Sequence, residues 1–300
     1  MLTIIIPYYK ISFFKETLQS LERQTCKNFK LFIGNDASPE NPENLIKETL
    51  KTTAFNYKEY TENFGFQNLV KQWERCIQDS EISEWFQILG DDDVLLPDFV
   101  ENFYKNLAAI EGYGCKVIKV KRRTIDGNGN FLSDFTNYDT LIDVKQYFSN
   151  KILNGARSSL SEHIFKISSY KKFGFRDFPL AWASDDAAIL EFSECRPIYF
   201  INKGGVLIRI SNENISGKKD NLDLKEKAGI IYQKFLLNKH LNKIDKKAAL
   251  HLINMQIFYR YHHNIPLSIN LPYLYLRLGC IKKIITLPRT FYILQQHKKK

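Results

Sequence analysis

Strand-like and helix-like segments alternate through the first 110 residues, and this alternation limits the fold more than any other feature. Residues 2–6, 29–33 and 85–89 are short apolar runs rich in β-branched or aromatic residues, which is typical of buried strands. Amphipathic stretches with helical spacing lie between these runs. This order predicts an α/β fold, with a mostly parallel sheet covered by helices on both faces.

Local signals predict where the other elements begin and end. Ser12 is the expected N-cap of the first helix, and Asn41 with Pro42 is the expected start of the second, over residues 42–52. Further strands are expected over 57–60, 116–121, 198–201 and 206–210, a turn over 126–130, and helices over 66–77, 97–107, 187–192 and from 216 onward.

A polar cluster directly follows each of the three confident strands. The carboxyl ends of parallel strands lie at one edge of a sheet, and ligands bind at that edge. We therefore expect the three clusters to lie close together in space. They are Pro7-Tyr8-Tyr9, Asn35-Asp36-Ala37-Ser38 and Gly90-Asp91-Asp92-Asp93.

The aspartate triplet, residues 91–93, carries adjacent like charges that disfavour joint ionisation unless a cation compensates them. Mg²⁺ or Mn²⁺ suits such a site, because these ions keep water ligands and take phosphate oxygens from a substrate. The triplet therefore suggests a nucleoside-diphosphate compound. An acidic turn before the helix at Pro97 is the alternative, since acidic residues are favoured at helix starts. Asp36 is either a turn residue or an acceptor for a base N–H group.

These motifs together resemble the family 2 inverting glycosyltransferases with a GT-A fold, and their order and spacing match over roughly the first 110 residues. The resemblance implies a Rossmann-like, mostly parallel sheet flanked by helices, with a C-terminal helical appendage. Residues 1–110 would form the donor-binding half and 111–215 the acceptor-binding half of one domain, followed by a basic helical region over 216–300. The matching stretches are residues 4–10, 20–25, 35–38 and 89–97.

The resemblance also implies a role for each polar residue near a nucleotide-sugar donor. Asp36 would read the base, Asp91 would lie beside the ribose, and Asp92 would bind the metal ion of an Asp-x-Asp motif. Asp93 would share the metal, and Arg209 would contact the donor phosphates, with a plain surface arginine as its alternative. The remaining donor-binding residues are Pro7, Tyr8 and Tyr9.

An acidic pair before an amphipathic helix stands where the family has its general base. Inversion by in-line displacement needs a base to take the acceptor hydroxyl proton, and a metal to stabilise the departing diphosphate. We expect Asp186 to be this base, with Asp185 as the alternative. The other interpretation is that both residues merely cap the helix at 187–192.

Three positions depart from the family's pattern. Gly90 stands where the family often has Asp, and Gln67 stands where a basic residue is common. Ser211 replaces the usual His, so a histidine ligand is not expected there. His163 and Arg157 lie in the region expected to meet the acceptor, but neither has a partner pattern, and packing or solvation is the expected role of each.

The net charge of +10 is concentrated in the last part of the chain. Residues 216–300 contain 17 basic and 4 acidic residues, which gives +13, whereas residues 1–215 carry −3. Lys and Arg alternate with large apolar residues over 266–300, a pattern typical of peripheral contact with an anionic membrane. Packing on the catalytic domain is the alternative. Nucleic-acid binding is not expected, because no recognition motif is present.

The remaining features favour a cytoplasmic protein, at most peripheral on the inner face of the membrane. The five cysteines are scattered without a CxxC pattern, and we find neither a signal-peptide pattern nor a long apolar span. A dehydrogenase is excluded, because Pro7-Tyr8-Tyr9-Lys10 replaces the glycine-rich turn after the first strand.

The predicted function is transfer of a sugar, of the hexosyltransferase type, from a nucleotide-diphosphate donor to a hydroxyl group. A UDP-sugar is the expected donor, and a glycan or lipid-linked acceptor of cell-envelope polysaccharide synthesis is the expected partner. The alternative is a catalytically inactive GT-A-like subunit that binds nucleotide or acts as a scaffold in a polysaccharide assembly complex.

Overall fold

The computed structural model describes residues 1–65, 67–266, 268 and 270–286. The chain forms two compact units, one of Met1–Val144 with Ser158–Ala228 and one of Lys145–Arg157 with Gly229–Lys300. The predicted boundaries at 110 and 215 separate binding roles within the chain, and they remain predictions.

Parallel strands build the N-terminal part of the sheet in the first unit. The central strand β1 pairs in parallel with β2 and β4, and β3 extends the sheet from β2. The register places Tyr8 opposite Asn35 and Ile5 opposite Ile88, so the carboxyl ends of β1, β2 and β4 lie at one edge. The predicted strands and their shared edge are confirmed. The strand bounds are β1 Leu2–Tyr8, β2 Phe29–Asn35, β3 Asn56–Glu59 and β4 Trp85–Ile88.

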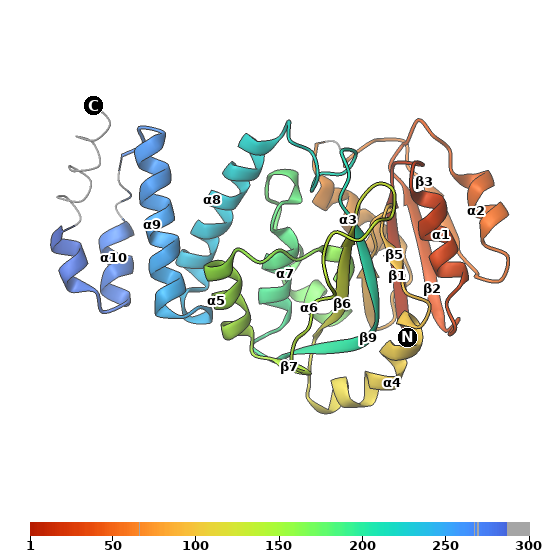
Figure 1. Cartoon of the computed structure of the whole chain (residues 1–300), viewed down its shortest axis with the longest axis horizontal. Coiled ribbons are helices and arrows are strands. Elements are labelled where there is room, and N and C mark those ends of the chain that lie inside the picture. Colours follow the sequence, from red (N-terminus) through yellow and green to blue (C-terminus); the bar gives the residue numbers. More distant parts are fainter. Residues whose placement is uncertain (66, 267, 269, 287–300) are drawn as a thin grey trace. The chain divides into compact units, whose positions relative to one another are not determined.

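The second part of the sheet mixes strand directions. β8 (His163–Lys166) is antiparallel to both β4 and β6 (Val117–Ile125), whereas β9 (Ile198–Arg209) is parallel to β6 and runs beside it (Figure 1). β9 also pairs antiparallel with β5 (Val94–Leu95) and β7 (Leu141–Ile142). Within the described residues this makes a nine-stranded sheet in the order β3-β2-β1-β4-β8-β6-β9-β5, with β7 on β9.

The two strands expected over 198–201 and 206–210 are the paired ends of the single strand β9. Between them, residues 202–205 bulge opposite Lys121 of β6. Gly205 makes this bulge possible, because its φ is +145° and an added Cβ would lie 2.4 Å from the Lys121 carbonyl oxygen. The predicted turn after β6 is also present, since the Asp126 N–H donates to the Asn130 carbonyl at 2.9 Å.

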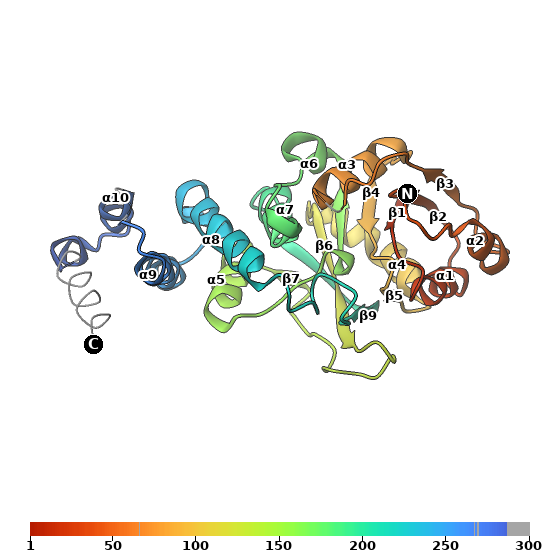
Figure 2. The same cartoon turned by 90° about the horizontal axis from the view of Figure 1, so that it is seen from above.

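Helices cover both faces of the sheet, with α1, α2 and α4 on one side and α3, α6 and α7 on the other (Figure 2). Ile4, Phe14 and Phe103 belong to the buried core beneath the first group. The rings of Phe165, Phe175 and Phe192 lie 5.3–6.1 Å apart on the opposite face. The helix bounds are α1 Phe14–Glu22, α2 Glu43–Thr49, α3 Leu69–Asp79, α4 Phe99–Gly112, α6 Ile167–Phe173 and α7 Ser184–Phe192, with the 3₁₀ turns η1 Leu160–Glu162 and η2 Pro179–Ala181.

Two predicted helix starts differ from the structure. Phe13 takes the N-cap position of α1 without a side-chain hydrogen bond, so the predicted Ser12 cap is wrong. Pro42 is the N-cap of α2 and not its first residue, although the Asn41 Oδ1 still accepts the Glu43 N–H at 2.8 Å. Phe66, expected in the third helix, lies outside the described residues.

The second unit is helical, as expected for the region after residue 216. It contains most of α5 (Val144–Asn154), the later part of α8 (Leu222–Lys239), η3 (Leu241–Lys243), α9 (Lys246–His262) and α10 (Asn270–Arg277). The Asp245 carboxylate caps α9 by accepting the Ala248 N–H at 2.7 Å, and the Asp245 N–H donates to Ser149 of α5 at 2.8 Å. In the part of the chain that the structure describes, no helix is long and apolar enough to cross a membrane.

Candidate functional site

The three polar clusters meet at the carboxyl edge of β1, β2 and β4. The Asp91 Oδ2 accepts the backbone N–H groups of Tyr9 and Lys10 at 2.8 and 2.9 Å. The Asp36 N–H donates to the Tyr8 carbonyl at 3.0 Å, and the Ser38 hydroxyl donates to the Tyr9 carbonyl at 2.6 Å. The first cluster therefore joins the other two, and the predicted convergence is confirmed.

Asp92 and Asp93 face partners that are distant in the sequence. The Asp92 Oδ2 accepts a hydrogen bond from the Asn214 amide at 2.9 Å. Asp93 is 5 % exposed, and its two oxygens accept the Arg209 N–H at 2.9 Å and the Ser161 hydroxyl at 2.5 Å. Asp93 therefore already ties the triplet to β9 and to η1.

Burial dominates the electrostatics of the triplet. It raises the pKa of Asp91 and of Asp93, and the neighbouring Asp92 charge raises both further. Burial also raises the pKa of Asp92, against the Asn214 hydrogen bond and the Arg209 charge, which lower it. The three crowded carboxylates therefore resist ionisation, and a cation bound beside them would stabilise their charged forms.

The triplet can supply some, though not all, of the ligands of a hard divalent cation. Among the described residues, no group of three or more His, Cys, Asp or Glu side chains forms a complete metal site. Mg²⁺, however, is often held by one or two carboxylates plus water and substrate phosphate oxygens. Asp92 suits this role, whereas Asp93 is occupied by Ser161 and Arg209. Metal binding by Asp92 and Asp93 remains a prediction.

Arg209 is only 1 % exposed, so the alternative of a surface arginine is wrong. Its Nε donates to the Asp92 carbonyl at 3.0 Å, and Nη1 donates to the Asp126 carbonyl at 3.1 Å. Nη2 donates to the Glu16 carboxylate at 2.6 Å, and the guanidinium lies 4.4 Å from the centre of the Phe13 ring. Arg209 thus braces the triplet against α1 and the turn after β6. The predicted phosphate contact stays a prediction.

Asp36 is buried beneath the loop that precedes α3. Its oxygens accept the N–H groups of Phe64 and Gly65 at 2.8 and 2.7 Å, and it forms an ion pair with Arg75. Burial raises the pKa of Asp36, although these partners oppose the shift. An added Cβ at Gly65 would lie 2.6 Å from Asp36 Oδ2, so glycine permits this approach. No motif in the sequence marked Arg75, whose guanidinium also lies 3.8 Å from the centre of the Tyr60 ring.

Asp185 and Asp186 lie in the first turn of α7. Ala183 occupies the N-cap position in a left-handed conformation with φ of +68°, and α7 has no side-chain cap, so the interpretation of the pair as caps is not supported. Asp186 is 8 % exposed, and its Oδ1 accepts the Ser158 hydroxyl at 2.7 Å. The structure therefore gives Asp186 a defined partner, while the choice between the two carboxylates as base remains a prediction.

Sequence reasoning missed the serines that contact these acids. Ser158 reaches Asp186, and Ser161 reaches both Asp93 and the Gly90 N–H, which donates to its hydroxyl at 3.0 Å. Serines in the stretch 158–161 resemble an ordinary polar loop, so no sequence signal identified them. His163 is buried, so of the two roles expected for it, packing and solvation, the structure shows packing.

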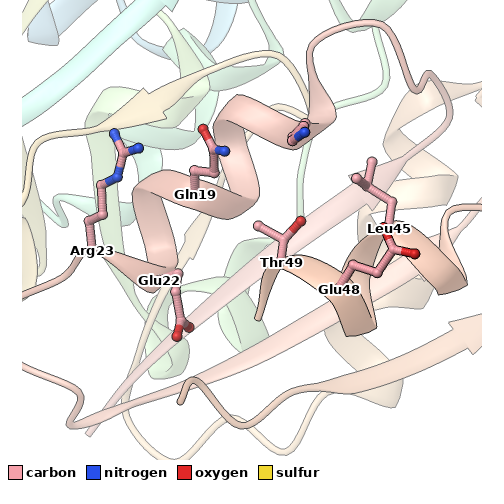
Figure 3. Close-up of a pocket in the computed structure, with 7 residues that line it drawn as sticks. Gln19, Glu22, Arg23, Leu45, Glu48 and Thr49 are labelled. Carbon is pink, nitrogen blue, oxygen red and sulfur yellow. The ribbon is translucent and has the colours of Figure 1, made fainter. Parts of the chain in front are cut away.

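A cavity of about 310 Å³ lies elsewhere, between α1 and α2 (Figure 3). Its lining mixes acidic, basic and neutral side chains and includes no predicted site residue. We therefore do not associate it with the polar edge of the sheet. The lining residues are Lys15, Gln19, Glu22, Arg23, Leu45, Glu48 and Thr49.

Comparison with known families and structures identifies the family and the fold. The family described as Glycosyl transferase family 2 matches residues 3–176, which is more than half of the chain. No curated protein sequence matches.

Solved structures of S. aureus TarS are similar to this chain. TarS 1-349 has a TM-score of 0.62 at 15 % identity, over 98 % of this chain and 82 % of that chain. Its complex with UDP-GlcNAc gives 0.63 at 15 %, over 94 % and 81 %, and its complex with UDP gives 0.55 at 16 %, over 97 % and 91 %. This chain spans 43 % of a longer TarS structure. At this identity the likeness shows the fold, which is the GT-A fold predicted from the sequence.

Proposed function

The chain belongs to glycosyl transferase family 2, and from this premise we propose that it is an inverting, hexosyltransferase-type enzyme. It moves a sugar from a nucleotide-diphosphate donor, with a UDP-sugar as the first candidate, to a hydroxyl group of a glycan or lipid-linked acceptor. The TarS structures with UDP and UDP-GlcNAc support a nucleotide-sugar donor.

The observation that carries this proposal is the meeting of β1 with the aspartate triplet. Backbone amides of Tyr9 and Lys10 hold Asp91, and Asp92 lies next to it with a raised pKa. This arrangement suits a ribose and a diphosphate beside a divalent cation. A solvated acidic turn would not need its carboxylates fixed by three separate segments of chain, with one of them, Asp93, buried.

Each acid then has one task in the reaction. Asp36 accepts an N–H group of the base, and Asp91 accepts a ribose hydroxyl. Asp92 holds Mn²⁺ or Mg²⁺, which when bound would compensate the charge of the departing diphosphate. The Asp186 carboxylate takes the proton from the acceptor hydroxyl as it attacks the anomeric carbon, with Asp185 as the alternative base.

The first experiment measures UDP binding by calorimetry with and without Mn²⁺. We expect binding to strengthen with Mn²⁺, and Asp92→Ala to weaken the Mn²⁺-dependent binding at least tenfold. Asp134→Ala, which removes an exposed loop carboxylate, is the matched control and leaves binding unchanged. Absent binding, or binding that ignores the metal, would overturn the metal-assisted transfer proposed here.

The second experiment screens nucleotide sugars for slow, metal-dependent release of UDP or another nucleotide. Asp186→Ala should spare UDP binding and lower turnover about 10³-fold, because the general base is removed. If Asp185→Ala has this effect and Asp186→Ala does not, the assignment of the base is reversed. Nucleotide binding without turnover of any donor would favour the inactive scaffold subunit.

We also propose that the protein works in the cytoplasm, peripheral to an anionic membrane, through residues 266–300. Residues 246–300 contain 10 Lys or Arg and no Asp or Glu. In the described part of this region, Leu276, Ile281 and Ile285 are 58–75 % exposed beside exposed Lys282 and Lys283. The rest of the segment, residues 267, 269 and 287–300, lies outside the described residues.

Vesicle flotation of the full chain tests this location. We expect it to float with vesicles that contain phosphatidylglycerol and not with neutral vesicles. The double variant Lys282→Glu/Lys283→Glu should lose this binding, because it opposes the attraction to anionic lipid. The control Lys47→Glu, in the first unit, should keep it. If the unmodified chain, the double variant and the control all float equally, membrane contact through residues 266–300 is contradicted.

A further inference from the structure

One short segment, residues 158–163, contacts both the predicted base and the aspartate triplet; we call it the serine strap. It contains η1 (Leu160–Glu162) and leads into β8. The Ser158 hydroxyl donates to Asp186 at 2.7 Å, and the Ser161 hydroxyl donates to Asp93 at 2.5 Å. Two hydroxyls three residues apart therefore reach two acids that are 93 positions apart in the chain.

Ser161 also fixes the turn from which the triplet projects. Its hydroxyl accepts the Gly90 N–H at 3.0 Å while it donates to Asp93, so it bridges the two ends of the turn 90–93. The Ser161 carbonyl accepts the Gln87 amide of the adjacent strand β4 at 2.6 Å. Ser161 is buried, and its hydroxyl holds both ends of the turn that carries Asp91 and Asp92.

The strap is anchored by a buried ionic cluster. Glu162 is fully buried, and its carboxylate contacts Lys119 at 2.8 Å and Arg122 at 3.1 Å, both on β6. The same carboxylate accepts the Ser159 N–H at 2.8 Å, and the Ser159 carbonyl lies 2.8 Å from the His163 Nδ1. A segment held this way keeps its serines in place, which is how supporting groups preorganise a site.

We propose that Ser158 and Ser161 are positioning residues with separate effects, Ser158 on the base and Ser161 on the donor site. This inference rests on the proposed function. A hydrogen bond from Ser158 restricts the Asp186 carboxylate to one orientation, so it acts on the proton-transfer step. The Ser161 bridge restricts the acidic turn, so it acts on the affinity for the nucleotide.

The test compares Ser158→Ala with Ser161→Ala in the full chain, using UDP with Mn²⁺ for binding and the donor found in the screen for turnover. Ser158→Ala should lower kcat roughly 10- to 100-fold and change the UDP Kd less than twofold, because a hydrogen bond to a charged group is lost. Ser161→Ala should raise the UDP Kd about tenfold or more. Ser158→Thr keeps the hydroxyl and should restore most of kcat.

Ser193→Ala is the matched control, since Ser193 is buried at the other end of α7 and its hydroxyl donates to the Leu190 carbonyl. It should leave kcat and Kd unchanged. If Ser161→Ala does not fold, Ser161→Cys replaces the hydroxyl by a slightly larger thiol, which is a weaker donor, and should still raise the UDP Kd.

Three outcomes overturn the inference. If Ser158→Ala and Ser161→Ala change kcat and Kd in the same way, or if neither differs from the unmodified protein, the inference on the serines is overturned and the proposed function stands. A Ser193→Ala effect as large as that of Ser158→Ala would reduce Ser158 to a general structural role. An unmodified protein that turns over no nucleotide sugar would overturn the proposed function as well, and this is measured first.

Discussion

Two acidic groups of the first unit differ in how their charge is compensated: the buried Glu162 and the aspartate triplet, of which Asp93 is buried. Glu162 lies between two cations of β6, Lys119 and Arg122, within 3.1 Å of each. The aspartate triplet, residues 91–93, receives mainly neutral donors, namely amides and a serine hydroxyl. Its neighbour Arg209 forms its ion pair with Glu16.

The difference separates an acid that stabilises the fold from acids that are available for a ligand. The charge of a buried carboxylate beside two cations is compensated within the protein, and neutralising that carboxylate removes a favourable interaction of a buried charge. Buried carboxylates that repel one another instead destabilise the fold until a cation arrives. Neutralising Glu162 should therefore lower the free energy of unfolding, whereas neutralising one aspartate of the triplet should raise it.

The largest effect is expected at Glu162. Glu162→Gln should lower the free energy of unfolding by about 3–5 kcal/mol, because the buried Lys119 ammonium loses the carboxylate charge that lies 2.8 Å from it. Urea denaturation at pH 7 measures this loss. The control Glu43→Gln breaks the exposed pair with Lys47 and should cost no more than about 0.5 kcal/mol. Similar losses in both variants would remove the distinction drawn here.

In the aspartate triplet, neutralising one acid is expected to stabilise the protein. Asp91→Asn keeps an oxygen that can accept the Tyr9 and Lys10 amides but removes one of the crowded charges. We expect it to raise the free energy of unfolding by about 1–2 kcal/mol at pH 8 in a metal-free buffer. A loss of stability under these conditions would contradict the account of the triplet as uncompensated.

The stabilisation by Asp91→Asn should also depend on pH. The pKa of Asp91 is raised in the folded protein, so the folded state binds more protons than the unfolded state above pH ~4, the ordinary value. The unmodified protein therefore loses stability as the pH rises, and its difference from Asp91→Asn grows from near zero at pH 4. Adding Mn²⁺ should stabilise the unmodified protein and reduce or reverse that difference.

The smallest effect is expected at Glu194, a compensated acid near the surface. Burial raises the pKa of Glu194, but hydrogen bonds from Lys116, Lys172 and Ser169 outweigh it and lower the pKa to about 2. Its contribution is thus present above its ordinary pKa of about 4.3 and is lost as the pH falls toward 2. Glu194→Gln should cost about 0.5–1 kcal/mol at pH 7 in urea denaturation, and less at pH 3. A cost that is constant with pH would show that the charge is not involved.

The parts of this molecule that could be predicted depend on local patterns. The strands β1, β2 and β4 are apolar runs with polar residues directly after them, and parallel pairing then brings those residues together. The serine strap, the Arg75 contact with Asp36 and the bracing by Arg209 join residues 28 to 117 positions apart. No spacing rule encodes such contacts, because they arise only when distant elements pack together, as when β8 and β9 enter the sheet or α3 packs beside β2.

The long strand β9 has a consequence for how the site forms during protein synthesis. β9 pairs with β5, and its Arg209 N–H group donates to Asp93, which lies 116 residues earlier in the chain. Both partners come after residue 176, where the match to the family ends. The aspartate triplet leaves the ribosome long before the strand that braces it. A chain that stopped before β9 would carry the whole aspartate triplet and its contacts with Tyr9, Lys10 and Ser161, and it would lack the contacts that Arg209 supplies.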